Sequence, residues 1–277
     1  MRPFTNATRK LLLLAPSERA VPEVFRGARG DAGRHAKLLT EAQAFRGRVY
    51  LADGAIKPWQ MVDGRHQAEI DEGSWHVLVL DPYGQVCGCA RYKEYRAGTP
   101  YRELGVSRSA LAASREWGQM LNGAVEAELA LSRRLDCPMS ELGGWALDEE
   151  IRGTAEALRM ALATYALTQE LGGAIGLSSV THRHGSASIL RRMGGRSLAS
   201  HGVELPAYYD PQYECEMEIL RFYSWAPNPR YNVWIEEMKA CLRTAPVLTN
   251  GVAGPEWVAA MRMRRFDETV LRAASAG

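Results

Sequence analysis

The sequence lacks a long apolar run, an excess of charge of one sign and a high cysteine count. Over 277 residues, 34 lysines and arginines balance 32 aspartates and glutamates to a net charge of +2, which argues against a general nucleic-acid binder. The early apolar run at residues 11–15 is too short for a membrane span or for the hydrophobic part of a signal peptide. We therefore expect no nucleic acid as partner and no membrane span.

The five cysteines are an odd number, and with no secretory leader apparent they favour a reducing cytoplasm over a disulfide framework. Cys87 and Cys89 alternate on a predicted strand without a second pair, which indicates core packing rather than a zinc ribbon or a redox motif. His182 and His184 lack a third ligand at a telling spacing, and zinc usually needs three or four. The sequence predicts a cytoplasmic protein without a metal site.

The composition that is present is that of an ordinary globular protein, with 46% hydrophobic and 24% charged residues. The charge is uneven, because residues 1–50 hold ten basic and four acidic residues. We expect this basic N-terminal part to help recruit an acidic partner, since opposite charge raises the encounter rate. Residues 1–35 are rich in arginine, glycine and proline without a clean period, which predicts a poorly ordered N-terminal arm.

Periodicity and turn residues divide the rest of the chain into strands and helices. Strands are predicted at 47–52, 75–81, 86–92, 141–147, 174–180 and 214–222, the second and third forming a hairpin. Helices are predicted at 36–46, 107–135, 149–171, 186–193, 231–242 and 255–273. The fold class is α/β (α+β), a mixed central sheet flanked by helices. We expect one domain over 36–230 and a helical C-terminal extension, 231–277, packed on it.

The junction between the predicted strand 141–147 and the next helix suits a phosphate group. It runs from Leu147 through Asp148, the predicted N-cap, to Arg152-Gly153-Thr154-Ala155. An arginine and a glycine at a helix start offer a guanidinium, unpaired N–H groups and the positive end of the helix dipole. An ordinary capped helix with a surface arginine fits the same residues.

A second basic turn follows the predicted strand 174–180. Arg183 and His184 lie there between strand and helix, and residues 181–196 contain four arginines and no acid. In α/β folds, strand ends and helix starts tend to line ligand crevices. The turn is a candidate anion site, with a solvated basic helix face as the alternative.

Four carboxylates are candidates for burial: Glu69, Asp71, Glu141 and Glu218. A buried acid is costly unless it is paired or protonated, so each of them calls for a partner or a chemical role. Glu141 begins the strand that leads to the 148–155 turn, where an acid could reach a ligand bound along that strand.

The order of hairpin, helix, strand with Glu141, Arg-Gly helix start, strand and short helix resembles the GNAT acyltransferase fold. In that family an Arg/Gln-x-x-Gly-x-Gly/Ala turn binds the pyrophosphate of an acyl-coenzyme A. Residues 152–155 match its final part, whereas Glu149 departs from the basic or amide residue often found first. The resemblance implies a GNAT-like mixed sheet, and donor binding by Leu147, Arg152, Gly153, Thr154, Ala155, Arg183 and His184.

Residues 40–225 resemble more closely the branch of acyl-homoserine lactone synthases and N-acyl amino acid synthases. That branch carries an arginine shortly before an aromatic residue, acids before the first long strand, an arginine ending the next strand, and a strand glutamate. These features are matched by Arg46 and Tyr50, by Glu69 and Asp71, by Arg91, and by Glu141. The lactone synthases have an arginine three positions after the glutamate, where this chain has Gly144.

The resemblance implies an N-acyltransferase that moves a long-chain fatty acyl group from acyl carrier protein (acyl-ACP) or acyl-coenzyme A (acyl-CoA) to an amine. The acceptor would be an amino acid or a similar small molecule, and no cofactor would be tightly bound. Glu141 and Arg91 are implied as catalytic residues, Glu141 as the base that takes the amine proton. Arg46, Tyr50 and Trp145 are implied as substrate-binding residues.

Two other functions stay open at this point. A signal synthase that uses S-adenosylmethionine fits the same branch, although Gly144 stands where its arginine is expected. An inactive GNAT-like binding module is the other, because Leu190 replaces the tyrosine that many GNAT enzymes use to protonate the leaving thiolate. The predicted helix 107–135 would wall the acyl pocket, or simply pack the core.

Overall fold

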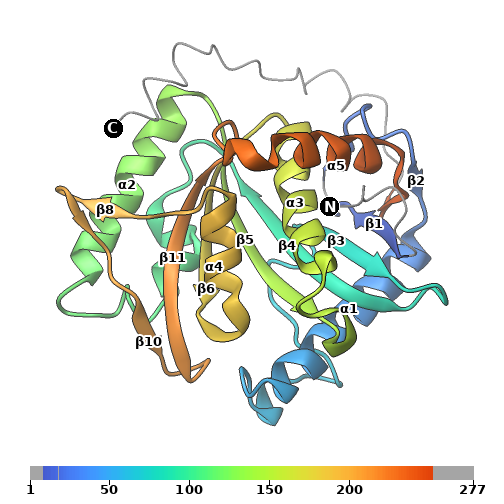
Figure 1. The fold of residues 1–277 in the computed structure, drawn as a ribbon, viewed down its shortest axis with the longest axis horizontal. Coiled ribbons are helices and arrows are strands. Elements are labelled where there is room, and N and C mark those ends of the chain that lie inside the picture. The colour runs from blue at the N-terminus through green and yellow to red at the C-terminus, as the bar shows by residue number, and fades with distance from the viewer. Residues whose placement is uncertain (1–8, 18, 252–277) are drawn as a thin grey trace. The chain divides into compact units, whose positions relative to one another are not determined.

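The computed structural model describes residues 9–17 and 19–251, which divide into two compact units. Unit 1 comprises residues 9–93 without residue 18, 144–171 and 233–251, and unit 2 comprises residues 94–143 and 172–232. Figure 1 labels their main elements. Both units combine a mixed sheet with helices, so the predicted mixed α/β class is confirmed. The predicted boundary at residue 230 stays a prediction.

Unit 1 is built on strands in the order β4-β3-β1-β12-β2. They are β1 Lys10–Leu14, β2 Ala28–Gly30, β3 Trp75–Leu80, β4 Val86–Tyr95 (residues 86–93 in this unit) and β12 Val247–Thr249. β3 runs antiparallel to β4 and β1, whereas β12 runs parallel to β1 and β2. Every residue of β3 is buried, as expected for a strand covered on both faces.

Helices cover both faces of the unit 1 sheet. α1 (Ala32–Ala52) begins after Asp31, whose side chain accepts a hydrogen bond from the N–H of Arg34. Buried residues of α1 pack in one core cluster with Cys89 of β4, so α1 covers the face of the sheet to which Cys89 points. The next residue back, Gly88, faces Met160 of α3 (Ala155–Glu170), so α3 lies on the opposite face. α5 (Asn232–Thr244) precedes β12, and η2 (Pro58–Gln60) and η5 (Glu149–Ile151) are 3₁₀ turns.

Unit 2 is built around β11 (Cys215–Tyr223). It pairs antiparallel with β6 (Ile175–Thr181), β10 (Tyr208–Asp210) and β7 (Arg196–Ser197), and β6 pairs parallel with the first residues of β5 (Met139–Leu147). The helices are α2 (Gly118–Arg134) and α4 (Ser186–Met193), with 3₁₀ turns η3 (Tyr101–Glu103), η4 (Gly105–Arg108), η6 (Arg183–Gly185) and η7 (Pro229–Tyr231). β8 (Ala199–Ser200) and β9 (Val203–Glu204) form a small hairpin.

The predicted poorly ordered arm over residues 1–35 is wrong for residues 10–14. These form β1, in which four consecutive leucines are buried between β3 and β12. A strand covered on both faces shows a continuous apolar run rather than an alternation, so residues 10–14 have no strand period. The predicted strand at 47–52 is also wrong, because these residues complete α1.

Two predicted helices begin later than expected. Residues 107–117 form a 3₁₀ turn and tight turns, and α2 begins only at Gly118. Residues 149–151 form the 3₁₀ turn η5, and α3 begins at Ala155 after Thr154, whose hydroxyl accepts a hydrogen bond from the N–H of Glu156. The predicted helix 255–273 lies outside the described residues. Among the helices of the described ranges, none has the length and apolar character needed to cross a bilayer.

Candidate functional site

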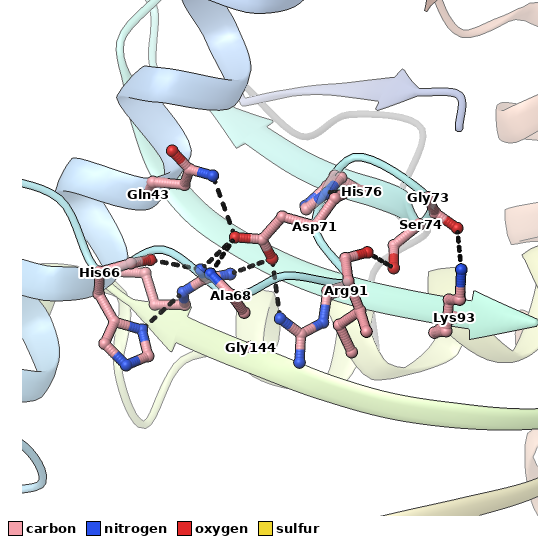
Figure 2. A network of polar contacts seen from close by, with 12 residues as sticks. Gln43, His66, Ala68, Asp71, Gly73, Ser74, His76, Arg91, Lys93 and Gly144 are labelled. Carbon is pink, nitrogen blue, oxygen red and sulfur yellow. Dashed lines mark hydrogen bonds and ion pairs between the residues drawn. The ribbon is translucent and has the colours of Figure 1, made fainter. Parts of the chain in front are cut away.

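The most densely bonded polar group in unit 1 is the carboxylate of Asp71, which is 1% exposed (Figure 2). Its Oδ2 accepts hydrogen bonds from Arg46 Nη2 at 2.7 Å, from Gln43 Nε2 at 3.0 Å and from the N–H of Ala68 at 3.0 Å. Its Oδ1 accepts from Arg46 Nη1 at 3.2 Å and from Arg91 Nη1 at 2.8 Å. We call the three charged residues Arg46, Asp71 and Arg91 the arginine–aspartate cluster.

The cluster assembles from three elements. Gln43 and Arg46 lie one helical turn apart on α1, so both side chains reach the same carboxylate. Asp71 stands in the loop before β3, and Arg91 stands on β4, opposite His76 of β3. The side chain of Arg46 is 3% exposed and that of Arg91 16% exposed, so Arg91 is the cluster's outer member.

The charges within the cluster set the protonation states of its neighbours. Burial alone would raise the pKa of Asp71, but the hydrogen bonds and charges of Arg46 and Arg91 outweigh it and hold that pKa well below its usual range. Burial and the charge of Arg46 lower the pKa of His66 to about 4. Burial likewise lowers the pKa of His76 to about 4, and its Nε2 lies 2.8 Å from the carbonyl oxygen of Asp71. Both histidines are therefore neutral at neutral pH.

His66 also has a defined tautomer. Its Nδ1 accepts a hydrogen bond from Arg46 Nε at 3.2 Å, so the ring proton is on Nε2. The ring lies edge-on to Tyr50 with 5.5 Å between centroids, and the Tyr50 hydroxyl donates to the carbonyl oxygen of Trp145 at 3.4 Å. The indole N–H of Trp145 is buried without a partner among the described residues.

Gly144 of β5 presses against the cluster with a positive φ of 62°. A Cβ at this position would be strained by the positive φ, and it would lie 3.2 Å from Arg46 Nη1 and 3.3 Å from Arg91 Cβ, so both arginines would have to shift. The Cys89 thiol donates to the carbonyl oxygen of Gly144 at 3.4 Å, and burial raises the pKa of that thiol to about 11. The space beside Gly144 is therefore taken by the side chains of Arg46 and Arg91.

Glu141 lies in unit 2, where three donors hold its carboxylate. Its Oε2 accepts from the Tyr95 hydroxyl at 2.6 Å and from the N–H of Gly105 at 2.7 Å, and its Oε1 accepts from the N–H of Val106 at 2.8 Å. Glu141 thus ties the 3₁₀ turn η4 to β5. A carboxylate offers about four lone-pair sites, so about one remains on Oε1.

The guanidinium of Arg152 is occupied within unit 1. Nη1 and Nη2 form a bidentate pair with Asp53 at 2.7 and 2.9 Å, and Nε donates to the carbonyl oxygen of Leu147 at 3.0 Å. Arg152 precedes α3 rather than standing in its first turn, because the N-cap of α3 is Thr154 and not the predicted Asp148. Asp148 caps the 3₁₀ turn η5 instead. Gly153 has a φ of 71°, and a Cβ there would have no atom of the described residues within 4 Å, so this side of its backbone is open to a ligand as far as residues 9–17 and 19–251 go.

The second basic turn, in unit 2, also uses its arginines internally. Arg183 Nη2 donates to the carbonyl oxygens of Tyr213 and Glu214 at 3.4 and 3.3 Å, and Arg191 pairs with Glu218. His184 adopts a left-handed backbone with φ of 57°. Among the described residues, no group of three or more histidines, cysteines or acids is arranged to hold a metal ion.

Some of the sequence candidates lie together within one unit. Arg46 and Arg91 meet at Asp71, and Tyr50 and Trp145 contact each other in the same unit. Glu141, Arg183 and His184 belong to unit 2. Gln43, His66 and Tyr95 were not predicted. The spacing of Gln43 to Arg46 was a usable signal, whereas the sequence held none for the other two.

No protein-family model and no curated protein matches this chain. Solved structures do match it. The acyl-homoserine lactone synthase BjaI, described as CoA-dependent and with SAM and isopentyl-CoA, is 13% identical, covers 96% of this chain and 99% of its own, and has a TM-score of 0.50. The N-acyl amino acid synthase FeeM from uncultured soil microbes is 15% identical over 78% of this chain and 92% of its own, with a TM-score of 0.45. The likeness to BjaI shows a GNAT-like fold.

Proposed function

We propose that this protein is an N-acyltransferase that moves a fatty acyl group from a thioester to the amine of an amino acid or a similar small molecule. One observation carries the proposal. Arg46, Asp71 and Arg91, which the family resemblance singled out in three separate segments, meet in one hydrogen-bonded cluster. The fold that this chain shares with BjaI, a CoA-dependent synthase, supports an acyl thioester as the donor.

The reaction needs few groups from the protein. The lone pair of the neutral amine attacks the thioester carbonyl carbon, the C–N bond forms, and the C–S bond breaks to release a thiolate. The amine proton passes to a base, directly or through water, because an ammonium has no lone pair to attack with. Glu141 is the proposed base through the lone pair left on Oε1. Backbone N–H groups of β5 are proposed to stabilise the oxygen that becomes negative.

The donor can be carried by acyl carrier protein or by coenzyme A, whose pantetheine arms share a phosphate. The proposed phosphate site is the start of α3, where Gly153 leaves the backbone open and unpaired N–H groups favour an anion. Arg152 would join this site only by exchanging Asp53 for the phosphate. Arg183 and His184 stay further candidates for donor binding.

A lactone synthase that uses S-adenosylmethionine is the second candidate, because BjaI belongs to that class. Gly144 argues against it. A lactone-synthase arginine cannot be placed there without moving Arg46 and Arg91, since a Cβ alone already approaches both within 3.4 Å.

One incubation separates these functions. Purified protein is mixed with acyl-CoA or acyl-ACP and, in parallel, with the twenty amino acids or with S-adenosylmethionine, and products are identified by mass spectrometry. We expect N-acyl amino acids, formed about 10²-fold more slowly by Glu141→Gln protein that has kept its fold. Acyl-homoserine lactone as the main product would make the second candidate correct. Absence of both products with every donor would leave a GNAT-like binding module.

A further inference from the structure

The arginine–aspartate cluster is not electrically neutral. Arg46 and Arg91 carry two positive charges, and within the part of the chain that the structure describes Asp71 is the carboxylate that pairs with them. His66 and His76 add no charge, because both are neutral at neutral pH. A net positive charge in a mostly buried site is costly unless an anion balances it.

Arg91 is the member of the cluster that can meet such an anion. Only its Nη1 is engaged, with Asp71, and its Nε and Nη2 have no partner among the described residues and are not sealed from solvent. Arg46, by contrast, uses Nε, Nη1 and Nη2 for His66 and Asp71. Figure 2 shows the Arg91 guanidinium on the side of the cluster that faces Gly144.

The guanidinium of Arg91 is also held in place before any ligand arrives. Asp71 is fixed by Gln43 and by the N–H of Ala68 as well as by Arg46, so its Oδ1 is a rigid anchor for Arg91 Nη1. A preorganised guanidinium loses little side-chain entropy on binding, and its planar edge matches a carboxylate with two parallel hydrogen bonds. One excess positive charge suits one carboxylate.

We propose that Arg91 binds the carboxylate of the acceptor, which makes the substrate an amino acid rather than a simple amine, and that Asp71 positions Arg91 for this contact. The proposal rests on the proposed acyl transfer and adds the feature that selects the acceptor. It predicts that the enzyme discriminates between an amino acid and the amine that remains when its carboxylate is removed.

The test compares matched acceptors. Phenylalanine and phenethylamine, and leucine and isopentylamine, are acylated with the same donor by wild-type protein and by Arg91→Met, which keeps the Arg46–Asp71 pair. We expect Arg91→Met to lower the ratio of kcat/KM for each amino acid to kcat/KM for its matched amine by about 10–100-fold. Arg91→Lys should recover part of the loss. The exposed Arg230→Met is the matched control and should leave both classes of acceptor unchanged.

A second measurement needs no donor. The melting temperature of the protein is followed with phenylalanine or phenethylamine at millimolar concentration; we expect phenylalanine alone to raise it, in wild type and Arg230→Met but not in Arg91→Met. A selective shift without acylation of any acceptor would refute the acyltransferase and keep the carboxylate site. Two results would overturn the carboxylate site and keep the transferase. One is an equal kcat/KM for amino acids and their matched amines. The other is a preference for amino acids that is unchanged in folded Arg91→Met or Arg91→Lys protein.

Discussion

Replacing Asp53 by asparagine should strengthen donor binding if Arg152 serves the donor phosphate. The guanidinium of Arg152 is spent on Asp53 and on the carbonyl oxygen of Leu147, so a phosphate can bind it only by displacing the carboxylate. Asp53→Asn removes the competing charge and leaves the phosphate as the better partner. Arg152→Ala removes the phosphate contact itself.

The size of the effect follows from the geometry of the pair. The two side chains are 26% and 16% exposed, so the pair is partly screened by solvent and contributes about 1–2 kcal/mol. Removing the competitor should therefore lower the donor KM by about 5–30-fold. Arg152→Ala should raise the donor KM by about tenfold. Arg152 contributes to donor binding only the difference between its contact with the phosphate and the contact with Asp53 that the phosphate displaces. The acceptor KM should move by less than about twofold in either variant.

Steady-state kinetics with varied donor and saturating acceptor measure these constants, and calorimetric titration of the donor checks that KM follows binding. Glu149→Gln is the matched control, because it removes one exposed negative charge from the neighbouring turn without touching the pair. If Asp53→Asn and Glu149→Gln change the donor KM equally, or leave it unchanged, the exchange does not occur. Arg152 would then be a structural tie between the end of α1 and the residues before α3.

Three further predictions concern the cluster and the strand glutamate. Glu141→Gln places an amide N–H against the donors and removes the proposed base, so we expect kcat to fall by about 10²-fold. Tyr95→Phe removes one donor to Glu141 and should lower kcat by less than about tenfold; equal losses of kcat would make Glu141 structural. In urea unfolding, Gly144→Ala should destabilise by about 2–3 kcal/mol, but Gly153→Ala, with similar φ and open space, by only about 1 kcal/mol; equal losses would refute the close packing. Because the folded pKa of His76 is about 4 against 6.5 unfolded, stability should fall by up to about 3 kcal/mol as pH drops from 6.5 to 4, and less in His76→Gln, as urea unfolding at each pH would show.

The sequence predicted the elements whose signals are local. α4 occupies the predicted residues 186–193, because Gly185 and Gly194 bound it on both sides with positive φ. The hairpin of β3 and β4 also lies where its apolar, β-branched residues and the turn at 82–85 predicted it, and β5 includes the predicted strand 141–147. In each case the side chains that decide the structure stand within the element or next to it.

The errors arose where distant residues decide. Residues 47–52 have a strand-like composition, yet Val49 and Tyr50 pack as part of a helix against the core of unit 1. Gly47 weakens a helix by itself, but here the side chain of Met61 packs against it, and a Cβ at this position would make that side chain move. Neither contact can be read from the local sequence.

The candidate site was partly predictable for the same reason. The resemblance indicated Arg46, Asp71 and Arg91 one by one. Only the fold brings the two arginines to the carboxylate of Asp71. The three donors to Glu141 were missed because they stand in residues 95–106, part of a stretch without regular periodicity. A long-range hydrogen bond leaves no pattern in a single sequence.

The buried thiol of Cys89 can report how often the protein opens locally. A thiol with a pKa of about 11 carries almost no thiolate at neutral pH, and its hydrogen bond to Gly144 is made beneath Arg91. Cys89 is 2% exposed, so an alkylating reagent can reach it only when the structure around it opens. The rate at which Cys89 is labelled therefore measures the local opening of the protein around Arg46 and Arg91. A ligand that binds these arginines should lower the labelling rate.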